Sequence, residues 1–342
     1  MKNKLLILFF FLFFKQFAAA SFFPNCKNED HKKYNKCIGS KIYILGDKYV
    51  GTWEKGKRHG KGIYTWPNGE KYIGNFKNGK QDGKGSFTWP NGEKYVGEWK
   101  KDKQDGKGSF TWPNGEKYVG EFKNGKQNGK GVFTWPNGEK YDGNFTNGKQ
   151  NGKGVFTWPN GEKYKGDYLN GWKHGKGTYL WPNGEKYIGE WKKNSMSGIG
   201  KKTFPNKIIQ YGVWEHDKFN QSKTDLWLGN RYKNGIEIVQ DYTLALKHYL
   251  ASAKGKNKKA MKEISKLYIE KKIIVQLNPI EKTLNFLNNG RLENNKRALK
   301  AYMWASLSED TNLKDSIKLD KEELIKAKKL VKDCLTKQYK GC

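Results

Sequence analysis

Aromatic and small residues alternate with polar residues along the chain from about position 49 to position 211. In Tyr72–Phe76 the even positions carry Tyr, Gly and Phe, and the odd positions between them carry Ile and Asn. In Gly83–Trp89 the odd positions carry Gly, Gly, Phe and Trp, whereas the even positions carry Lys, Ser and Thr. Strict alternation with a period of two predicts β-strands with one aromatic face and one solvated face.

Two kinds of turn signal separate these strands. Asn78-Gly79 begins one connection and Pro90-Asn91-Gly92 forms the next, because proline fixes φ and glycine tolerates positive φ. Each unit is therefore predicted to be a β-hairpin, and successive hairpins are predicted to form one antiparallel sheet. The glycines between the aromatic residues leave room for rings from adjacent hairpins to lie across the strands.

The pattern recurs with a fixed period of 23 residues. A fixed period in this range indicates a solenoid-like array, in which no unit folds alone and each buries its face against its neighbours. A degraded eighth copy follows at Tyr211, which comes 24 residues after the preceding tyrosine. The regular copies open at Tyr49, Tyr72, Tyr95, Tyr118, Tyr141, Tyr164 and Tyr187.

The order of residues within one copy, residues 118–140, resembles the MORN repeat. The copy has a Tyr-x-Gly-x-aromatic start at Tyr118, a Gly-x-Gly at Gly129–Gly131 and a turn glycine at Gly138. The resemblance implies an elongated, single-layer array of antiparallel β-hairpins over residues 49–217. MORN proteins are known as scaffolds and have been proposed to bind acidic phospholipids, so the resemblance also implies a role in interactions.

From residue 218 to residue 342 the composition changes, and Leu, Ala, Ile and Lys recur at the spacing of α-helices with one buried stripe. Within this part, Leu228–Tyr232 and Tyr249–Ala253 resemble one copy of a Sel1-like (TPR-like) repeat. The fold class expected is thus β and α in separate domains. The second resemblance implies that the helical domain makes protein–protein contacts.

A second Sel1-like copy opens at Ala260, and its second helix is expected at Asn294–Ala305. An insertion around Ile273–Asn289 departs from the family pattern. A closing helix is expected from Leu319 to Tyr339, with Asp320 as its N-cap. The predicted apolar stripe of that helix is Leu324, Ala327, Leu330, Val331 and Leu335.

The N-terminus has the pattern of an export signal. A short basic start, Met1–Lys4, precedes the apolar run Leu5–Phe14, and small residues follow up to Ala20. Ten residues rise only about 15 Å as a helix, which is too short for a bilayer core of about 30 Å. We expect residues 1–20 to be a bacterial-type signal peptide cut near Ala20, which makes the protein secreted or periplasmic. The alternative is an uncleaved N-terminal membrane anchor, with the protein facing outside the cytoplasm.

Export makes disulfide pairing the expectation for the four cysteines. Cys26 and Cys37 lie close together before the array, and Cys334 and Cys342 lie at the C-terminal end. Both pairs are local, and the array between them contains no cysteine. The two predicted disulfides would therefore staple the two ends of the fold.

The first pair falls in an N-terminal cap at residues 21–48, in which the first half-hairpin is expected at Ile42–Asp47. His31 lies between Cys26 and Cys37, which raises the alternative of a Cys/His metal site. That spacing fits no zinc pattern, so no metal is expected.

The chain carries a formal charge of +32, which invites a nucleic-acid or membrane hypothesis. Only four of its basic residues are arginine, the side chain that favours bidentate phosphate binding, and the lysines are spread evenly. The coding bias of an AT-rich genome explains such a composition, and no specific nucleic-acid partner is expected. Peripheral attachment to acidic phospholipid stays open, through solvated lysines such as Lys77, Lys84, Lys123 and Lys130.

No constellation typical of catalysis is present. The five histidines have no partner at a recurring offset, and Gly79–Ser86 has a strand where a phosphate-binding loop needs a helix N-terminus. Glu70 and its equivalents recur in six copies, as expected of solvated turn charges. We therefore predict no catalytic residue, no metal ligand, no cofactor and no enzyme. The rival is an enzyme or regulatory subunit like the MORN-linked lipid kinases, but no nucleotide-binding signature supports it.

The aromatic face remains as the candidate site. Its rings are either the core of a thin protein or an exposed surface that binds an extended peptide, glycan or lipid. The expected function is a non-enzymatic binding or scaffolding module of the cell envelope, with an envelope protein or peptide as partner and oligomers allowed. The candidate residues are Tyr72, Phe76, Trp89, Tyr95, Trp99, Trp112, Tyr118, Phe122, Trp135, Tyr141, Phe145 and Trp158.

Overall fold

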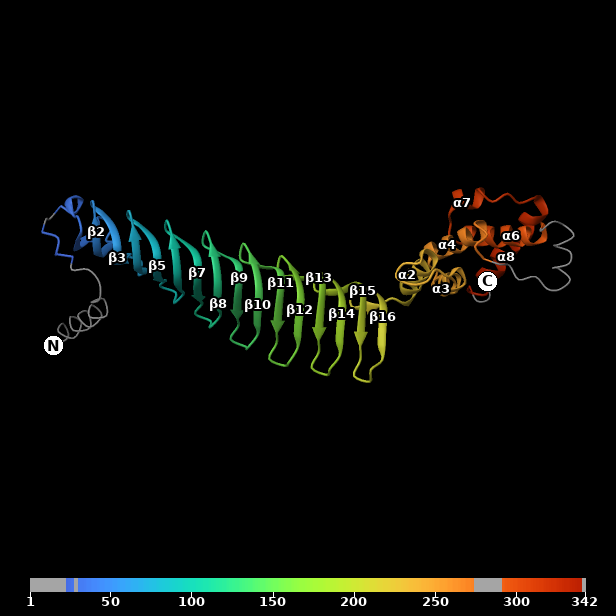
Figure 1. Ribbon diagram of the computed structural model, residues 1–342, viewed down its shortest axis with the longest axis horizontal. Helices are drawn as coiled ribbons and strands as arrows, with labels where there is room; N and C mark the ends of the chain where they lie inside the picture. Colours follow the sequence, from blue (N-terminus) through green and yellow to red (C-terminus); the bar gives the residue numbers. More distant parts are fainter. Residues whose placement is uncertain (1–22, 28–29, 274–290, 340–342) are drawn as a thin grey trace. The chain divides into compact units, whose positions relative to one another are not determined.

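The structure is a computed structural model of the chain, and it describes residues 23–27, 30–273 and 291–339. The chain divides into two compact units, of which the first ends at Trp172 and the second begins at Lys173. Figure 1 shows successive hairpins from β2 to β16, coloured blue to yellow, and then the helices from α2 to α8 in gold to red. The predicted order of an antiparallel hairpin array followed by a helical region is therefore confirmed.

Seventeen strands make up the array in the described part of the chain. Within each unit, the strands pair antiparallel with their neighbours in the sequence. The strands are β1 (Cys37–Ile42), β2 (Lys48–Glu54), β3 (Lys57–Thr65), β4 (Lys71–Lys77), β5 (Lys80–Thr88), β6 (Lys94–Lys100), β7 (Lys103–Thr111), β8 (Lys117–Lys123), β9 (Lys126–Thr134), β10 (Lys140–Thr146), β11 (Lys149–Thr157), β12 (Lys163–Leu169), β13 (Trp172–Leu180), β14 (Lys186–Lys192), β15 (Ser195–Thr203), β16 (Ile209–Glu215) and β17 (Lys218–Phe219).

The short connection within a repeat is a two-residue hairpin turn. Between β4 and β5 it is Asn78-Gly79, and both residues have positive φ, 52° and 86°. A two-residue turn with positive φ at both central residues has a twist that matches the twist of the flanking strands. Asn and Gly adopt positive φ readily, which explains why they occupy this turn. A β-bulge between Gly74 and Phe76 adjusts the register of the same hairpin.

The longer connection between repeats is a five-residue loop that closes on itself. In one copy the Trp89 N–H donates to the Glu93 carbonyl at 2.9 Å, and the Gly92 N–H donates to the Trp89 carbonyl at 3.0 Å. The Asn91 side chain accepts the Glu93 N–H at 3.1 Å, as asparagine commonly does in turns. These bonds recur in the other copies, so the loop is a fixed part of the repeat.

Hydrogen bonds across the turns tie each repeat to the one before it. The Gly125 N–H donates to the Gln104 carbonyl at 2.8 Å, and the Gly148 N–H donates to the Gln127 carbonyl at 2.9 Å. Each turn thus needs its neighbour as an acceptor. This coupling is the expected property of an array in which one unit does not fold alone.

The first strand of the array starts earlier than the sequence pattern predicted. The half-hairpin strand is Cys37–Ile42 and not Ile42–Asp47. Residues 43–47 form the turn instead, because the Tyr43 N–H donates to the Asp47 carbonyl at 2.8 Å and Gly46 takes a φ of 90°. The apolar side chains of Ile44 and Leu45 are therefore exposed at the turn.

The N-terminal cap makes the contacts that a preceding repeat would make with the first hairpin. The Trp53 indole donates to the Gly39 carbonyl at 3.1 Å, as the Trp99 indole donates to the Gly85 carbonyl at 3.3 Å. Tyr34 meets Trp53 edge-on with ring centroids 5.3 Å apart. The repeat tyrosine Tyr72 meets Trp99 in the same way at the same distance. Tyr34 therefore takes the place of the tyrosine that a preceding repeat would supply.

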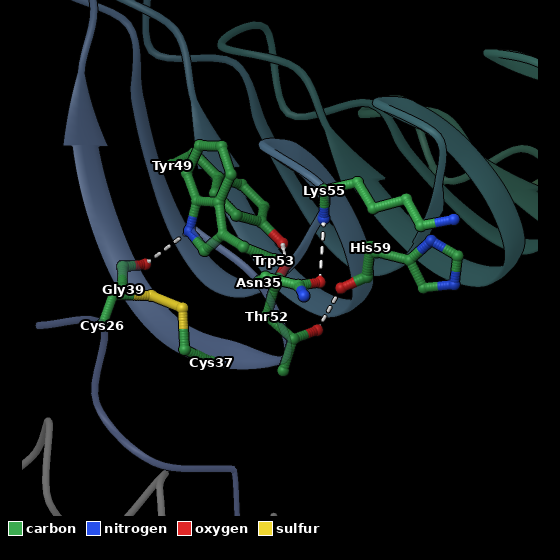
Figure 2. Close-up of a disulfide and its surroundings, with 9 residues drawn as sticks. All are labelled: Cys26, Asn35, Cys37, Gly39, Tyr49, Thr52, Trp53, Lys55 and His59. Carbon is green, nitrogen blue, oxygen red and sulfur yellow. Dashed lines mark hydrogen bonds between the residues drawn. A yellow bond between two sulfur atoms is a disulfide. The ribbon is translucent and has the colours of Figure 1, made fainter. Parts of the chain in front are cut away.

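A disulfide between Cys26 and Cys37 holds this cap in place (Figure 2). A Cβ added to Gly39 would lie 2.8 Å from the Cys26 sulfur, so the half-cystine covers the bare glycine. The predicted N-terminal pairing is confirmed.

Replacing Cys26 and Cys37 by serine is expected to lower the stability of the first hairpin by roughly 2–3 kcal/mol, because the bond closes a short loop in the unfolded chain. Hydrogen exchange should then show faster exchange of the β1 and β2 amides, while the β8 and β9 amides keep their protection and serve as an internal control. Unchanged protection of β1 would show that the disulfide does not hold the end of the array.

The helical region packs around its own core of Tyr249, Ile264, Leu267 and Trp304. Side-chain N-caps start several of its helices, for example Asp241, which accepts the Leu244 N–H at 2.9 Å. The Sel1-like resemblance stays a prediction, and the expected insertion lies, apart from Ile273, outside the described residues. The helices are α2 (Gln221–Asn234), α3 (Tyr242–Lys254), α4 (Lys258–Ile269), α6 (Arg291–Leu307), α7 (Thr311–Asp315) and α8 (Lys321–Thr336).

The closing helix α8 begins as predicted but buries a different stripe. Asp320 and Glu323 form a capping box at its start. The helix buries Ala327 and Cys334 and leaves Leu330 and Leu335 exposed, so the apolar stripe predicted for it is partly wrong. Burial follows the helical spacing of seven residues from Ala327 to Cys334. Cys342 lies outside the described residues, so its pairing with Cys334 stays a prediction.

Candidate binding face

The aromatic residues that recur in the regular copies lie on one face of the sheet because of the strand alternation, whereas Tyr211 of the degraded eighth copy lies on the opposite face. Tyr72, Gly74 and Phe76 share a face of β4, and the register places Tyr72 opposite Phe87 and Gly74 opposite Gly85. The strand pairing therefore puts the rings and the glycines of neighbouring strands side by side. On this face the rings form two rows, an inner row over the glycines and an outer row near the long loops.

The inner row consists of tyrosines that lie on paired glycines. A Cβ added to Gly85 would be 2.3 Å from the Tyr72 hydroxyl oxygen, and one added to Gly74 would be 2.5 Å from the same atom. The Tyr72 hydroxyl donates to the Asn75 carbonyl at 3.0 Å. Glycine is thus required here because the tyrosine ring fills the space of a side chain.

Edge-on ring contacts link the inner row from repeat to repeat. Tyr95 meets Trp99 of its own strand at 5.2 Å and Phe122 of the next repeat at 4.9 Å. Such T-shaped contacts are favourable beyond the area they bury. Eight of the candidate residues belong to this row and are buried, so they form the core of the sheet: Tyr72, Phe76, Tyr95, Trp99, Tyr118, Phe122, Tyr141 and Phe145.

The outer row alternates phenylalanine and tryptophan. The ring centroids of Phe110 and Trp112 are 4.4 Å apart, and those of Trp112 and Phe133 of the next repeat are 5.3 Å apart. The other four candidate residues are here: Trp89, Trp112, Trp135 and Trp158, all half-buried. The phenylalanines of the row were not among the sequence candidates, although the alternation of Phe87 with Gly85 and Trp89 indicates them.

The tryptophans of the two rows differ in their indole N–H groups. In the inner row, Trp99, Trp191 and Trp214 donate to glycine carbonyls at 3.3, 3.2 and 3.1 Å. In the outer row, Trp112 and Trp135 have no hydrogen-bond partner for Nε1 within residues 23–27, 30–273 and 291–339. Their rings are also partly exposed, so these donors face the surface and are available to an incoming acceptor.

Burial controls the ionisation of the tyrosine hydroxyls. It raises the pKa of Tyr118 to about 12, with a smaller contribution from the nearby Glu121 carboxylate. Burial likewise raises the pKa of Tyr72 and Tyr95 far above the ordinary value, helped by nearby acidic side chains. The hydroxyls therefore stay protonated at neutral pH and act as hydrogen-bond donors within the core.

The opposite face of the sheet carries mixed charges. Lys84 lies opposite Glu98 and Lys107 lies opposite Glu121 in the strand pairing, and Lys153 forms an ion pair with Asp167 at 2.6 Å. A hollow of about 860 Å³ beside the short turns is also lined by both lysines and carboxylates. Much of the positive charge on this face is therefore locally balanced.

The described residues contain no group of three or more His, Cys, Asp or Glu side chains that could hold a metal ion. The histidines make local pairs instead: His59 lies 3.3 Å from Glu54, and His248 lies 3.1 Å from Asp225. None of the helices in the described part of the chain is long and apolar enough to span a membrane.

Comparison with known proteins finds the MORN repeat family at residues 49–71, 72–94, 95–117, 118–140, 141–163, 164–186 and 187–207. No curated protein sequence matches the chain. Among solved structures, the TCP domain of Drosophila melanogaster SAS-4 is 11% identical, and the match covers 57% of this chain and 98% of that chain with a TM-score of 0.29. A mutant TCP10 domain of Danio rerio CPAP is 12% identical, with coverages of 52% and 89% and a TM-score of 0.30. Likenesses this weak carry no functional argument.

Proposed function

We propose, from the premise that residues 49–207 of this chain are seven tandem MORN repeats, that the protein is a binding and scaffolding module of the cell envelope. The repeats are a binding type and not a catalytic one. Protein–protein contact along the outer row is the interaction we assign to them. The helical region is proposed to add a second contact surface.

The observation that carries this proposal is the outer row itself. Trp89, Trp112 and Trp135 recur once per repeat, are half-buried rather than buried, and have unpartnered indole donors within the described ranges. A rigid row of this kind suits an extended ligand that meets the same surface several times. The inner row supplies the rigidity, because its buried rings fix the strands beneath.

The envelope assignment is supported by the sequence and by the cap. The N-terminal pattern of a cleavable signal, with a cut near Ala20, directs the chain out of the cytoplasm. A disulfide such as Cys26–Cys37 is typical of proteins in oxidising compartments. We therefore propose a secreted or periplasmic protein whose partner is an envelope protein or peptide.

A pull-down with the mature full-length chain tests the proposed function. The double substitution Trp112→Ala with Trp135→Ala is expected to reduce recovery of a specific envelope partner by at least tenfold, because aromatic anchors dominate such interfaces. The matched control is Trp172→Ala, since Trp172 is exposed at a short turn and lies outside the row. Circular dichroism must show that all variants keep their β-structure.

Equal recovery with the double variant and the control would contradict recognition by the outer row. Recovery that survives the double substitution but not deletion of residues 222–342 would place recognition in the helical region instead.

The second candidate function is peripheral attachment to acidic phospholipid. Exposed lysines such as Lys84 and Lys130 on the solvated face favour it, together with the charge of +32. Flotation with anionic vesicles at low salt and at about 0.15 M salt separates the two functions. Flotation that disappears at the higher salt would reduce the lipid interaction to nonspecific attraction.

A further inference from the structure

The outer row has a definite period along the sheet. Each repeat adds two strands, and strands are about 4.8 Å apart, so equivalent rings recur at about 9.6 Å. The ring centroids are compatible with this advance: Trp89 to Phe110 is 5.4 Å and Phe110 to Trp112 is 4.4 Å, so Trp89 and Trp112 are no farther apart than these two distances together. A ligand that contacts several repeats in the same way must have equivalent residues spaced at nearly this distance.

A polyproline II helix has this period. It rises about 3.1 Å per residue with three residues per turn, which places equivalent residues about 9.3 Å apart. A β-strand repeats at about 6.8 Å and an α-helix at about 5.4 Å, and neither matches the row. We propose that the outer row binds a proline-rich segment in the polyproline II conformation, with three ligand residues per MORN repeat.

The chemistry of the row fits the same ligand. Proline rings pack against aromatic side chains, and proline-rich segments generally bind in aromatic-lined grooves. The carbonyls of a polyproline II helix have no internal hydrogen-bond partners. The indole N–H groups of Trp112 and Trp135, which have no partner among the described residues, can therefore each donate to one ligand carbonyl, one repeat apart.

The glutamates of the long loops add a charge preference. Glu93, Glu116 and Glu139 close the loops that begin at the outer-row tryptophans, and no ion pair joins them within the described ranges. A basic residue in each turn of the ligand would meet one of these carboxylates.

The last repeat contains an internal example of such a contact. Lys202 occupies the position that Phe87 has in an earlier repeat. Its ammonium lies 4.7 Å from the Trp181 ring centroid and 2.7 Å from the Glu185 carboxylate. A lysine ammonium can thus contact the Trp ring and the loop glutamate of one repeat together, which is the pair of contacts that we assign to a ligand cation. The ligand class is accordingly a basic, proline-rich segment with a Lys or Arg at every third residue.

This inference rests on the proposed function, because it names the ligand of the same row. Titration calorimetry with the mature full-length chain tests it, using a peptide of about 12 residues built as Pro-Pro-Lys repeats, which spans about 37 Å. Ser-Gly-Lys repeats of equal charge and Pro-Pro-Glu repeats of equal stiffness are the two controls. We expect the Pro-Pro-Lys peptide to bind at least tenfold more tightly than either control at physiological salt.

Variants then locate the site. Trp112→Phe with Trp135→Phe keeps the rings but removes both indole donors, and should weaken binding roughly three- to tenfold. Trp112→Ala with Trp135→Ala should abolish binding, and Trp172→Ala should leave it unchanged. Equal binding of Pro-Pro-Lys and Ser-Gly-Lys repeats would overturn the proposal, because only charge would then be recognised.

A separate arm uses soluble β-1,4-linked amino-sugar oligosaccharides. Binding of these sugars that depends on Trp112, without binding of the proline-rich peptide, would identify a glycan ligand and overturn the proposal. The pull-down separates this assignment from the proposed function. If the chain does not bind the Pro-Pro-Lys peptide but still recovers a partner that is lost with Trp112→Ala and Trp135→Ala, the proposed function stands. Only the ligand assignment is then refuted.

Discussion

Replacing Gly97 by alanine is expected to destabilise the repeat array by about 3–4 kcal/mol, near the upper end for a single methyl group. A Cβ at this position would lie 2.4 Å from the Tyr95 hydroxyl oxygen, 2.5 Å from the Gly108 Cα and 2.7 Å from the Lys107 carbonyl oxygen. Two of these atoms belong to the backbone of the paired strand and cannot turn aside. The ring of Tyr95 would have to leave its place as well.

Gly125→Ala is the matched control. Gly125 has a positive φ of 81°, unlike Gly97, but nothing lies within 4 Å of the added Cβ. Asp102 and Asn194 hold the same turn position in other repeats at φ values of 70° and 71°, so a side chain is tolerated there. This variant should lose only about 1 kcal/mol, from the left-handed backbone.

Denaturant unfolding followed by tryptophan fluorescence measures both variants. The Gly97→Ala midpoint should move strongly to lower denaturant, and the transition should broaden if the damaged repeat uncouples its neighbours. Equal midpoints for Gly97→Ala and Gly125→Ala would show that the tyrosine-on-glycine contact does not hold the array together.

Raising the pH above about 10 is expected to unfold the array cooperatively. Burial raises the folded-state pKa of the seven tyrosines that open the regular copies above the ordinary value of 10.0, and to about 12 for Tyr118. Below pH 10 both states are protonated and the stability is complete. Above it the unfolded chain binds fewer protons, so the free energy of unfolding falls as the pH rises towards the folded pKa values. Seven hydroxyls of the same kind make this loss cumulative.

Tyrosinate absorbance and far-ultraviolet circular dichroism, recorded on one pH series, check this expectation. The repeat tyrosines should ionise together with the loss of β-structure, between about pH 10 and pH 12. Added salt should shift the transition little, because the main cause is burial and not charge. Ionisation of all tyrosines near pH 10 with the circular dichroism unchanged would mean that the hydroxyls are solvated.

The helical end of the chain shows where pattern-based prediction stops. The helix α8 and its Asp320 cap follow from the sequence, because capping is a local interaction. Which side the helix buries does not follow, since Leu324–Leu335 carries apolar residues on more than one side. Packing against the rest of the helical unit selects Ala327 and Cys334 and leaves Leu330 exposed.

The first strand of the array shows the same limit. The run Ile42–Leu45 looks like a strand by its apolar residues alone. Cys37–Ile42 is the strand because it pairs with β2 in register, and because the disulfide and Tyr34 cover the open end. These are contacts between residues separated along the chain, which a local pattern does not encode.

The sequence by itself determined the hairpin array, its period and its aromatic face, because strand alternation and turn chemistry act between near neighbours. It also determined the N-terminal disulfide, because the two cysteines lie close together in the chain. It left open whether the aromatic rings are core or binding surface. The tertiary structure decided which rings are buried: the inner row forms the core of the sheet, and the tryptophans of the outer row stay half-buried. Tyr95 lies over the paired glycines and is buried, whereas Trp112 lies near the loop and its indole donor has no partner in the described part of the chain. The two rings share one face of the sheet, and only the packing of neighbouring strands separates them.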